Sequence, residues 1–338
     1  MRLAIVVGVF VLVAGAASAQ AKPAILGGLG LDTWTRGLGI DAGSQGPPGL
    51  YLIYRTIDFR ANTARDGKGD ALPIAGLRIN ALANAFAVAY TAKPRGAPYL
   101  TVAASIPIAA VSFDSDVPSA AFDNLGLADI FVAPIRVGWR QPHYDLVTSY
   151  GFYAPTGRWD PQDVASVGRG YWINQFTVGG ALYLDTARHR RGSVLVSFER
   201  NQRRRGIEST RGNLLQVQGG AGTTVYPNVI AGVAWYALRQ VSDDKGAGLA
   251  LELAGARSRA YGLGPEIDLI IPRYRMRVDA RVEWEFDVVA RPQGIAFVIG
   301  AGRLAWMPRR PNRQSEWSRA SPSRGPEAPG ARRYFPRG

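Results

Sequence analysis

Histidine and cysteine, the residue types most often used for metal binding and nucleophilic catalysis, are scarce in this chain. Its 338 residues include no cysteine and two histidines, His143 and His189. Neither histidine has neighbours at a spacing typical of a metal site. The adjacent carboxylates Asp243 and Asp244 could contact calcium, but neighbouring acids are more often solvated. We therefore expect no metal site and no cofactor.

A serine–histidine relay would have to combine His143 with Ser149, or His189 with Ser193. On an extended strand, positions i and i+6 share a face, but about 20 Å separates them at roughly 3.3 Å per residue. That is too far for a proton relay, and the second pair fails similarly. The sequence also lacks a G-x-S-x-G elbow. We expect no catalytic residue and no enzyme.

Charge is concentrated in a stretch from 275 to 290, where charged and apolar residues alternate. The charged positions, which we predict to line an interior, are Arg275, Arg277, Asp279, Arg281, Glu283, Glu285 and Asp287. The apolar positions, which we predict to face lipid, include Met276, Val278, Val282, Trp284, Phe286 and Val288. A period of two indicates a strand with one charged and one apolar face.

The length of this stretch favours a membrane strand. Strands of globular proteins average about five or six residues, whereas a tilted strand that crosses a bilayer needs more and turns its charges to a wet interior. A strand of an antiparallel sandwich with one solvated face would also alternate, and it is the alternative interpretation.

The elements around this strand show the same character. From about residue 50 onward, segments rich in β-branched, aromatic and small residues are separated by alternately long and short polar connections. The longer connections are expected at 62–70, 114–124, 159–170, 203–212 and 242–259. This pattern predicts an all-β fold, an antiparallel up-and-down transmembrane β-barrel. Counting gives about 12 strands when 248–256 is assigned to a loop, and 14 is the alternative.

The two ends of the chain differ from this body. Arg2, the apolar run 3–14 and the small triplet 17–19 are typical of a signal peptide, more than of a membrane anchor. We predict a signal peptide at 1–19, a Gly-rich segment at 20–47 that enters the lumen or the periplasm, the barrel at 48–306, and a disordered basic tail at 307–338.

The formal net charge is +14, and residues 308–338 hold eight arginines against two glutamates. Such a balance can indicate nucleic-acid binding, but an export signal argues against that partner. A basic lumen or acidic lipid headgroups explain the charge better, and charge alone does not choose between them.

Several short motifs occur in one order along the chain. They are Pro48–Ile53, Gly126–Ile130 followed by Pro134 and Trp139, Ala154–Asp160, Gly168–Trp172, Arg239–Asp244 and Gly262–Glu266. Together, over roughly residues 45 to 306, they resemble a family of transporter-like outer-membrane barrels involved in the meta-pathway of phenol degradation. Barrels of that membrane usually end in an aromatic residue, whereas here the last strand is expected to end at Trp306 and the chain continues.

The resemblance implies a protein of the Gram-negative outer membrane that takes up small aromatic or hydrophobic compounds passively. Its expected partners are outer-membrane lipid, those solutes and the barrel-assembly machinery. For the motif residues we expect roles in turns and register more than ligand contact. These are Asp129, Pro134, Pro155, Gly157, Gln240, Asp243, Asp244, Gly264 and Pro265. Pro155 and Gly157 should end a strand and open a loop, and Gly264–Pro265 should start one.

Two other functions stay open at this point. Facing charges in a lumen could orient polar solutes, or they could pair and seal the barrel, which would then serve a structural or enzymatic role. A soluble exported β-sandwich that binds a ligand is the third class.

Overall fold

The structure, a computed structural model, describes residues 38–116, 119–160, 166–246 and 256–308. The predicted signal peptide and most of the predicted tail lie outside these ranges. Within them, no helix is long and apolar enough to cross a membrane.

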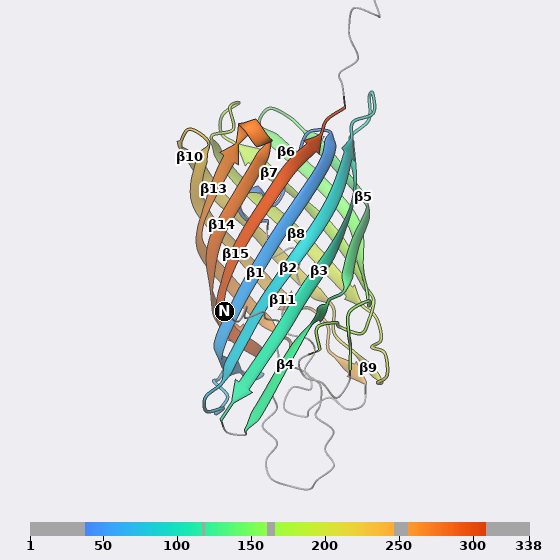
Figure 1. Cartoon of the computed structure of the whole chain (residues 1–338), viewed down its shortest axis with the longest axis vertical. Coiled ribbons are helices and arrows are strands. Elements are labelled where there is room, and N and C mark those ends of the chain that lie inside the picture. The colour runs from blue at the N-terminus through green and yellow to red at the C-terminus, as the bar shows by residue number, and fades with distance from the viewer. Residues whose placement is uncertain (1–37, 117–118, 161–165, 247–255, 309–338) are drawn as a thin grey trace, which may run out of the picture. The chain divides into compact units, whose positions relative to one another are not determined.

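Antiparallel strands form a closed ring in the described part of the chain (Figure 1). Neighbouring strands in the sequence are neighbours in the ring, and β2 pairs with both β1 and β3, which closes it. The ring strands are β1 (Gly49–Arg65), β2 (Arg78–Ala92), β3 (Tyr99–Ser115), β5 (Ile130–Arg140), β6 (Tyr144–Ala154), β7 (Ile173–Tyr183), β8 (Arg190–Asn201), β10 (Leu214–Tyr226), β11 (Val229–Gln240), β13 (Arg259–Ile271), β14 (Met276–Val289) and β15 (Arg291–Trp306). The predicted 12-stranded up-and-down barrel is confirmed, and the β-sandwich alternative is wrong.

The outer wall carries the apolar side chains that a strand presents on alternate positions. Phe176, Val178 and Leu182 of β7 are each at least half exposed, whereas the intervening Gln175 and Thr177 are buried inside. Because the strands of a closed ring pair on both sides, exposed apolar residues on its outside suit a lipid environment. The barrel is therefore of the outer-membrane type.

The two ends of the barrel differ in the length of their connections. One end has short turns, at 93–98, 141–143, 184–189, 227–228 and 272–275. The other end carries long connections, including 66–77, 155–172 and 202–213. In barrels of this type short turns face the periplasm and long loops face outside the cell. We name the two ends periplasmic and extracellular accordingly.

Some predicted strand boundaries differ from the structure. The expected loop 114–124 is mostly strand, because β3 extends to Ser115 and β4 (Ala120–Leu127) follows. Pro265 lies in the middle of β13 and does not start it. The missing N–H of Pro265 is accommodated because the β13–β14 pairing skips from Leu263 to Glu266.

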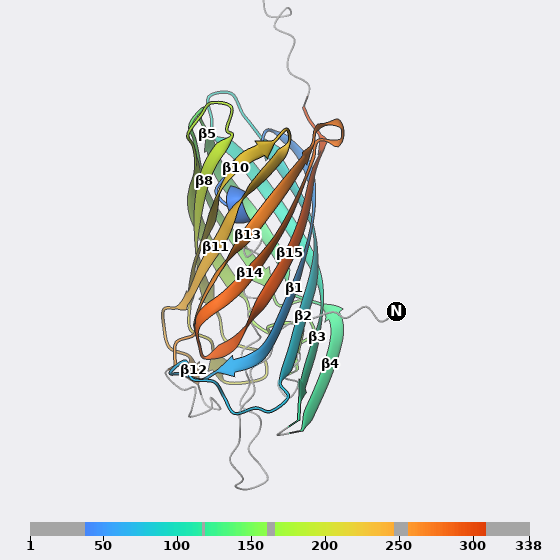
Figure 2. The same cartoon turned by 90° about the vertical axis from the view of Figure 1, so that its left-hand side faces the viewer.

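The β4 strand is the one strand of the thirteen-stranded sheet that stands outside the ring (Figure 2). The extracellular part of β3, from Ile108 to Ser115, pairs with β4. Its periplasmic part, from Tyr99 to Ser105, pairs with β5. Because the same strand changes partner, the wall of the ring is interrupted where β4 ends and β5 begins. We call the interruption at residues 128–129 the branch point.

Candidate functional site

The inner face of β13 and β14 carries a wall of opposite charges. Arg281 lies 3.6 Å from Glu266 and 3.2 Å from Glu283, and all three are buried. Arg277 lies 2.8 Å from the buried Asp268. Two more pairs extend the wall, Arg55 with Asp279 at 3.7 Å and Arg291 with Glu285 at 3.6 Å. Buried charges require such partners, so this face is an ion-paired network.

The charged positions predicted for the lumen do not all lie there. Asp279, Arg281, Glu283 and Glu285 are buried on the inner face, and Arg277 is partly buried beside them. Arg275 is exposed in the periplasmic turn with φ 49°. Asp287, with φ 45°, is exposed near the extracellular end and pairs with Arg259 at 2.6 Å. Left-handed backbone at both ends breaks the alternation that the sequence suggests.

The predicted lipid-facing set differs in one member. Trp284 and Phe286 are each 49% exposed. Met276, Val278 and Val282 lie on the same face and are partly exposed. Val288 is instead buried, at 3% exposure, because it follows the left-handed residue Asp287. The backbone there turns the side chain to the interior.

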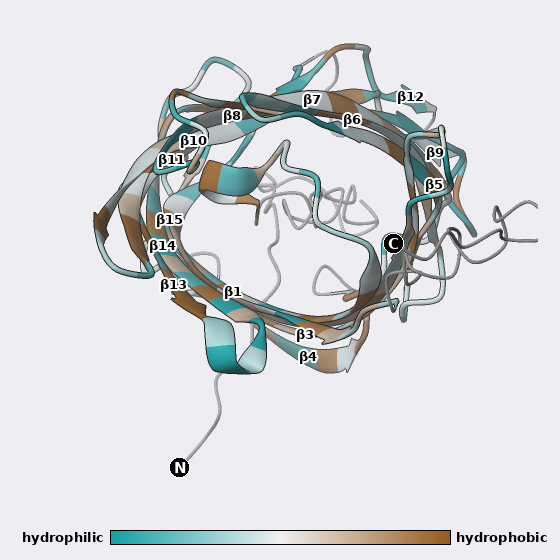
Figure 3. Cartoon of the chain, turned by 90° about the horizontal axis from the view of Figure 1, so that it is seen from above, coloured by the Kyte–Doolittle hydropathy of each residue, from teal (hydrophilic) through white to brown (hydrophobic). Residues whose placement is uncertain are grey.

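The chain segment before β1 lies within the lumen (Figure 3). Its short 3-10 helix η1 (Gly39–Asp41) contacts β8, β10 and β11. Asp41 pairs with Arg277 and with Arg191, the latter at 3.3 Å. The backbone N–H of Ile40 donates to Glu266 at 3.0 Å. We call residues 38–48 the plug; it is the described part of the segment that the sequence predicts to enter the lumen or the periplasm.

The far side of the plug is held by the opposite wall. The N–H of Gln45 donates to Asp145 at 2.9 Å, and Arg136 donates to the carbonyl of Ser44 at 2.8 Å. Asp145 is fully buried and also accepts from Arg188 at 2.9 Å. Polar contacts on both sides of the lumen thus fix the plug across its section.

Close backbone contact completes the seat of the plug. A Cβ on Gly43 would stand 2.2 Å from the carbonyl oxygen of Gly180, and one on Gly220 would stand 2.9 Å from the backbone of Ile40. Only glycine allows two backbones to approach this far. Gly220 and Gly222 of β10 therefore make room for Ile40 of the plug, and Gly43 of the plug allows its close approach to Gly180 of β7.

Towards the extracellular end, the side of the lumen formed by β1, β2 and β3 is apolar. The inner faces of β1, β2 and β3 carry Phe59, Ile79, Val111 and Phe113, each at most 5% exposed. Loop residues from 74 to 77 and Val167 pack on them. We call this buried group the apolar cluster; it includes Ala128 at the branch point.

Asp129 closes the branch point. Its buried carboxylate accepts the backbone N–H of Gly157 at 3.0 Å and that of Arg169 at 2.9 Å. These two residues belong to the loop after β6, which thereby lies against the interruption in the wall. Beside it, Arg204 is buried over the rings of Trp159 and Tyr171, at 4.8 and 5.1 Å.

The other motif residues hold loops or register. Gln240 and the N–H of Gly212 both donate to Asp244 at 2.7 Å. Arg257 pairs with Asp243 at 2.8 Å and holds the pKa of Asp243 below its usual range. Pro155 accepts from Arg205 through its carbonyl at 3.2 Å.

Pro134 and Gly264 mark places where pairing is irregular. The β5–β6 register shifts between Val132 and Ile135, around Pro134. A Cβ on Gly264 would meet the carbonyl of Val282. Pro134 and Gly264 therefore affect strand pairing and the close packing of neighbouring strands.

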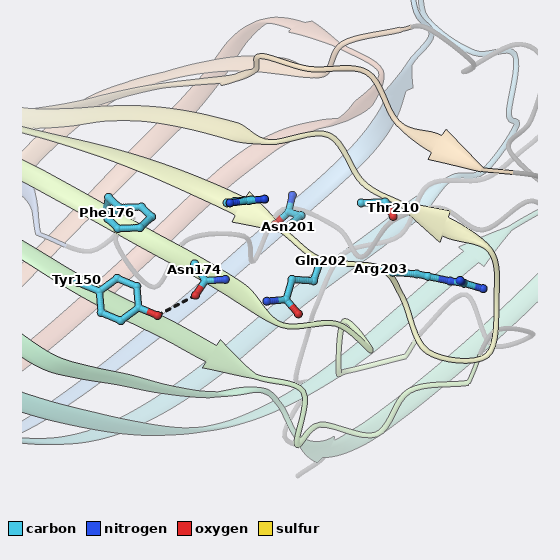
Figure 4. A pocket seen from close by; sticks show the side chains of 8 residues that line it. Tyr150, Asn174, Phe176, Asn201, Gln202, Arg203 and Thr210 are labelled. Atoms are coloured by element: carbon cyan, nitrogen blue, oxygen red, sulfur yellow. Dashed lines mark hydrogen bonds between the residues drawn. The ribbon is translucent and has the colours of Figure 1, made fainter.

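On the outer wall, the extracellular ends of β6, β7 and β8 border a groove of about 690 Å³ (Figure 4). Tyr150 donates to Asn174 at 2.8 Å, and Phe176 lies beside them. Arg200 and Arg203 supply its polar border. Arg203 pairs with Glu208 at 2.8 Å. The rest of the lining includes the aromatic rings of Tyr150 and Phe176 and the amides of Asn174, Asn201 and Gln202.

Neither histidine lies in a catalytic arrangement. His143 contacts the carbonyl of Tyr183 at 3.2 Å, and His189 lies 3.5 Å from Asp185, both in periplasmic turns. In the ranges that the structure describes, no group of three or more His, Cys, Asp or Glu could hold a metal ion.

The protein is a transmembrane β-barrel of the Gram-negative outer membrane. Its closed antiparallel ring, its apolar outer band, its plugged lumen and the short turns at one end assign it to this class. Within that class, the chain belongs to the family described as "Putative MetA-pathway of phenol degradation", whose model matches residues 61–299. The resemblance that the ordered motifs carry is therefore confirmed.

Comparison with solved structures finds similar chains. The COG4313 outer membrane channel from Pseudomonas putida F1 is similar with a TM-score of 0.67 at 10% identity, over 77% of this chain and 97% of that one. The translocator domain of the autotransporter NalP from Neisseria meningitidis gives a TM-score of 0.45 at 13% identity, over 78% and 91%. Among curated proteins, no sequence matches the chain.

Several residues of the site escape sequence reasoning. Asp41 pairs with Arg191, which is 150 positions away, and the N–H of Gln45 donates to Asp145, which is 100 positions away. No local pattern encodes such a contact. The Gly-rich run 219–222 is the sequence feature that could have indicated the plug, because small residues leave room for a neighbouring segment.

Proposed function

We propose that the protein is a channel through which small apolar compounds, including aromatic ones, diffuse passively across the outer membrane. The observation that carries this proposal is the unequal lining of the lumen. The plug and its ion pairs lie towards the periplasmic ends of β13 and β14. The apolar cluster occupies the extracellular side of β1–β3.

The charged wall argues against a wide polar pore. The acids that face the plug are engaged by arginines or by plug N–H groups, as with Glu266, Arg281 and Ile40. A polar solute would have to replace those contacts, and breaking a buried ion pair costs about 3–5 kcal/mol. An apolar solute that stays in the apolar cluster avoids this cost.

The branch point suggests the route out of the cluster. Ala128 belongs both to the apolar cluster and to the interruption between β4 and β5. A solute beside Ala128 is next to the branch point, where β3 changes its partner from β4 to β5. We infer that it leaves sideways, when the loop held by Asp129 moves, and so bypasses the plug.

Transport measurements on two solute classes test the proposal. Cells that make the protein should take up an aromatic hydrocarbon faster than cells without it, while liposomes should swell slowly in arabinose. Val111→Asn, which puts an amide in the apolar cluster, should lower aromatic uptake. Ser112→Asn puts the same side chain on the opposite face of β3 and is the matched control.

A sealed barrel with a structural role is the second candidate, because ion pairing and the plug support it as well. Aromatic uptake equal to that of cells without the protein would favour it and would contradict the channel. For either function we expect insertion by the barrel-assembly machinery, since the fold is a transmembrane barrel.

A further inference from the structure

The periplasmic rim carries a strong excess of positive charge. Its exposed cations lie on the short turns and on the strand ends next to them. They are Lys93, Arg95, Arg140, Arg190, Arg273, Arg275 and Arg303. The one acidic residue on the short turns is Asp185, and its oxygens accept the backbone N–H groups of His189 and Arg190. We call these seven cations the basic rim.

The extracellular end differs in how its charges are arranged. There, several exposed arginines stand in ion pairs, as Arg60 does with Asp58 at 2.7 Å, Arg257 with Asp243 and Arg259 with Asp287. Among the residues that the structure describes, Lys93, Arg140, Arg190, Arg273, Arg275 and Arg303 form no ion pair. The excess of positive charge at the periplasmic end is therefore open to an anionic partner.

Aromatic side chains place the basic rim at the depth of lipid headgroups. Tyr90 and Trp306 stack with centroids 6.4 Å apart on the outer wall, and both are exposed. Lys93 lies 4.7 Å from the centre of the Tyr99 ring, and Arg273 lies 5.6 Å from that of Tyr274. Aromatic girdles lie at the membrane interface, so cations beside them meet headgroups.

A groove between two periplasmic turns combines both kinds of contact. It has a volume of about 770 Å³ and its lining includes Leu184, Val225 and Tyr226 together with Arg190. His189 and Asp185 also line it, and the Asp185 carboxylate is engaged by the N–H groups of His189 and Arg190. Leu184 is 77% exposed and Tyr226 71%. The apolar side chains of the groove suit the acyl chain of a phospholipid, and the cation beside them suits its phosphate.

We propose that the basic rim binds anionic phospholipid of the periplasmic leaflet, with the groove beside Arg190 as one of its sites. Charge complementarity identifies this occupant, because clustered Lys and Arg next to a bilayer attract anionic lipid. An acidic protein would not need the apolar lining beside the cations. The proposal depends on the fold and its orientation and is independent of which solute the barrel conducts.

Lipid selectivity in vesicles tests the proposal. The full chain is reconstituted in phosphatidylcholine, and tryptophan quenching compares brominated phosphatidylglycerol with brominated phosphatidylcholine. We expect wild-type protein to favour the anionic lipid at least threefold, and 0.5 M NaCl to remove most of that preference, since salt screens exposed charges. The variant K93Q/R140Q/R190Q/R273Q should lose the preference.

The matched control is K68Q/R158Q/R200Q/R239Q, which removes the same charge from exposed residues of the extracellular end. It should retain the preference, and heat-modifiable migration on a gel checks that both variants are folded. Equal quenching by the two lipids in wild-type protein would overturn the proposal, and that result is also the one expected if the partner is an acidic protein. Equal loss in both variants, or a salt-insensitive preference, would overturn it as well.

Discussion

Asp41 holds the plug by charge, at the scale of a single residue. It reaches Arg277 of β14 and Arg191 of β8, so one carboxylate joins the plug to two separate strands of the wall. Hydrogen bonds to charged groups contribute about 1.5–3 kcal/mol each. Much of the binding free energy of the plug should therefore depend on this side chain.

Asp41→Asn keeps the size of the side chain and removes its charge. The plug should lose about 1.5–3 kcal/mol of binding free energy, so the fraction of time it is displaced should rise by about tenfold or more. Single-channel recording in planar bilayers would detect this as more frequent openings. Asp70→Asn, at an exposed loop acid, should leave the current unchanged. Equal opening of wild type and Asp41→Asn would refute the role of this charge.

Glycine in the plug determines whether the element can fit at all. The backbone of Gly43 touches the backbone of Gly180 on β7, and neither has a side chain that could move aside. A plug of the same charge with a larger residue here should remain tethered to β1 but leave its seat. This is a prediction about the element, because the barrel strands themselves are untouched.

Gly43→Val tests the seat. The chain has no cysteine, so Ile40→Cys introduces a unique thiol at a position with 0% exposure. A water-soluble maleimide should label that thiol slowly, and several times faster when Gly43→Val is added. Gly302→Val is the control, since a Cβ there meets nothing within 4 Å. Unchanged labelling with Gly43→Val would show that the plug adapts.

Substitution of Asp129 tests whether its carboxylate holds the loop closed at the branch point. Asp129→Ala leaves the N–H groups of Gly157 and Arg169 without their acceptor, at about 1–3 kcal/mol for each buried donor. Amide hydrogen exchange at 156–158 and 166–170 should accelerate, while exchange in β10 and β11 should not. Asp123→Ala, at an exposed acid of β4, is the control. Equal protection in both variants would mean that other contacts close the wall.

Local pattern explains which elements the sequence could predict. The alternation of β14 follows directly from the pleat, so its middle, from Asp279 to Phe286, has the expected two faces. Its ends do not, because left-handed residues at 275 and 287 are invisible to a period-two count. The β4 strand escaped prediction because Asp114, Asp116, Asp123 and Asn124 give the stretch 114–124 the composition of a loop. The plug contacts escaped it because they depend on distant pairs.

At the scale of the whole molecule, the position of a charge relative to the bilayer decides its cost. The same arginine is stable inside the ring, where Arg281 finds Glu266 and Glu283. It is also stable at the basic rim, where water and headgroups solvate it. Between those regions lies the outer band, where a charge meets only hydrocarbon. The barrel thus separates its charges by face and by depth.

Val233→Arg should therefore destabilise the barrel by about 2–4 kcal/mol, the cost of arginine near the bilayer midplane. Val233 is 44% exposed on the outer face of β11, several residues from either end of the strand. Tyr226→Arg, at the periplasmic end of β10, should cost about 0–1 kcal/mol because the headgroups solvate it. Urea unfolding in phosphatidylcholine vesicles measures both. Equal costs would place Val233 outside the hydrocarbon layer and would require a different depth for the barrel, which would also move the basic rim away from the lipid headgroups.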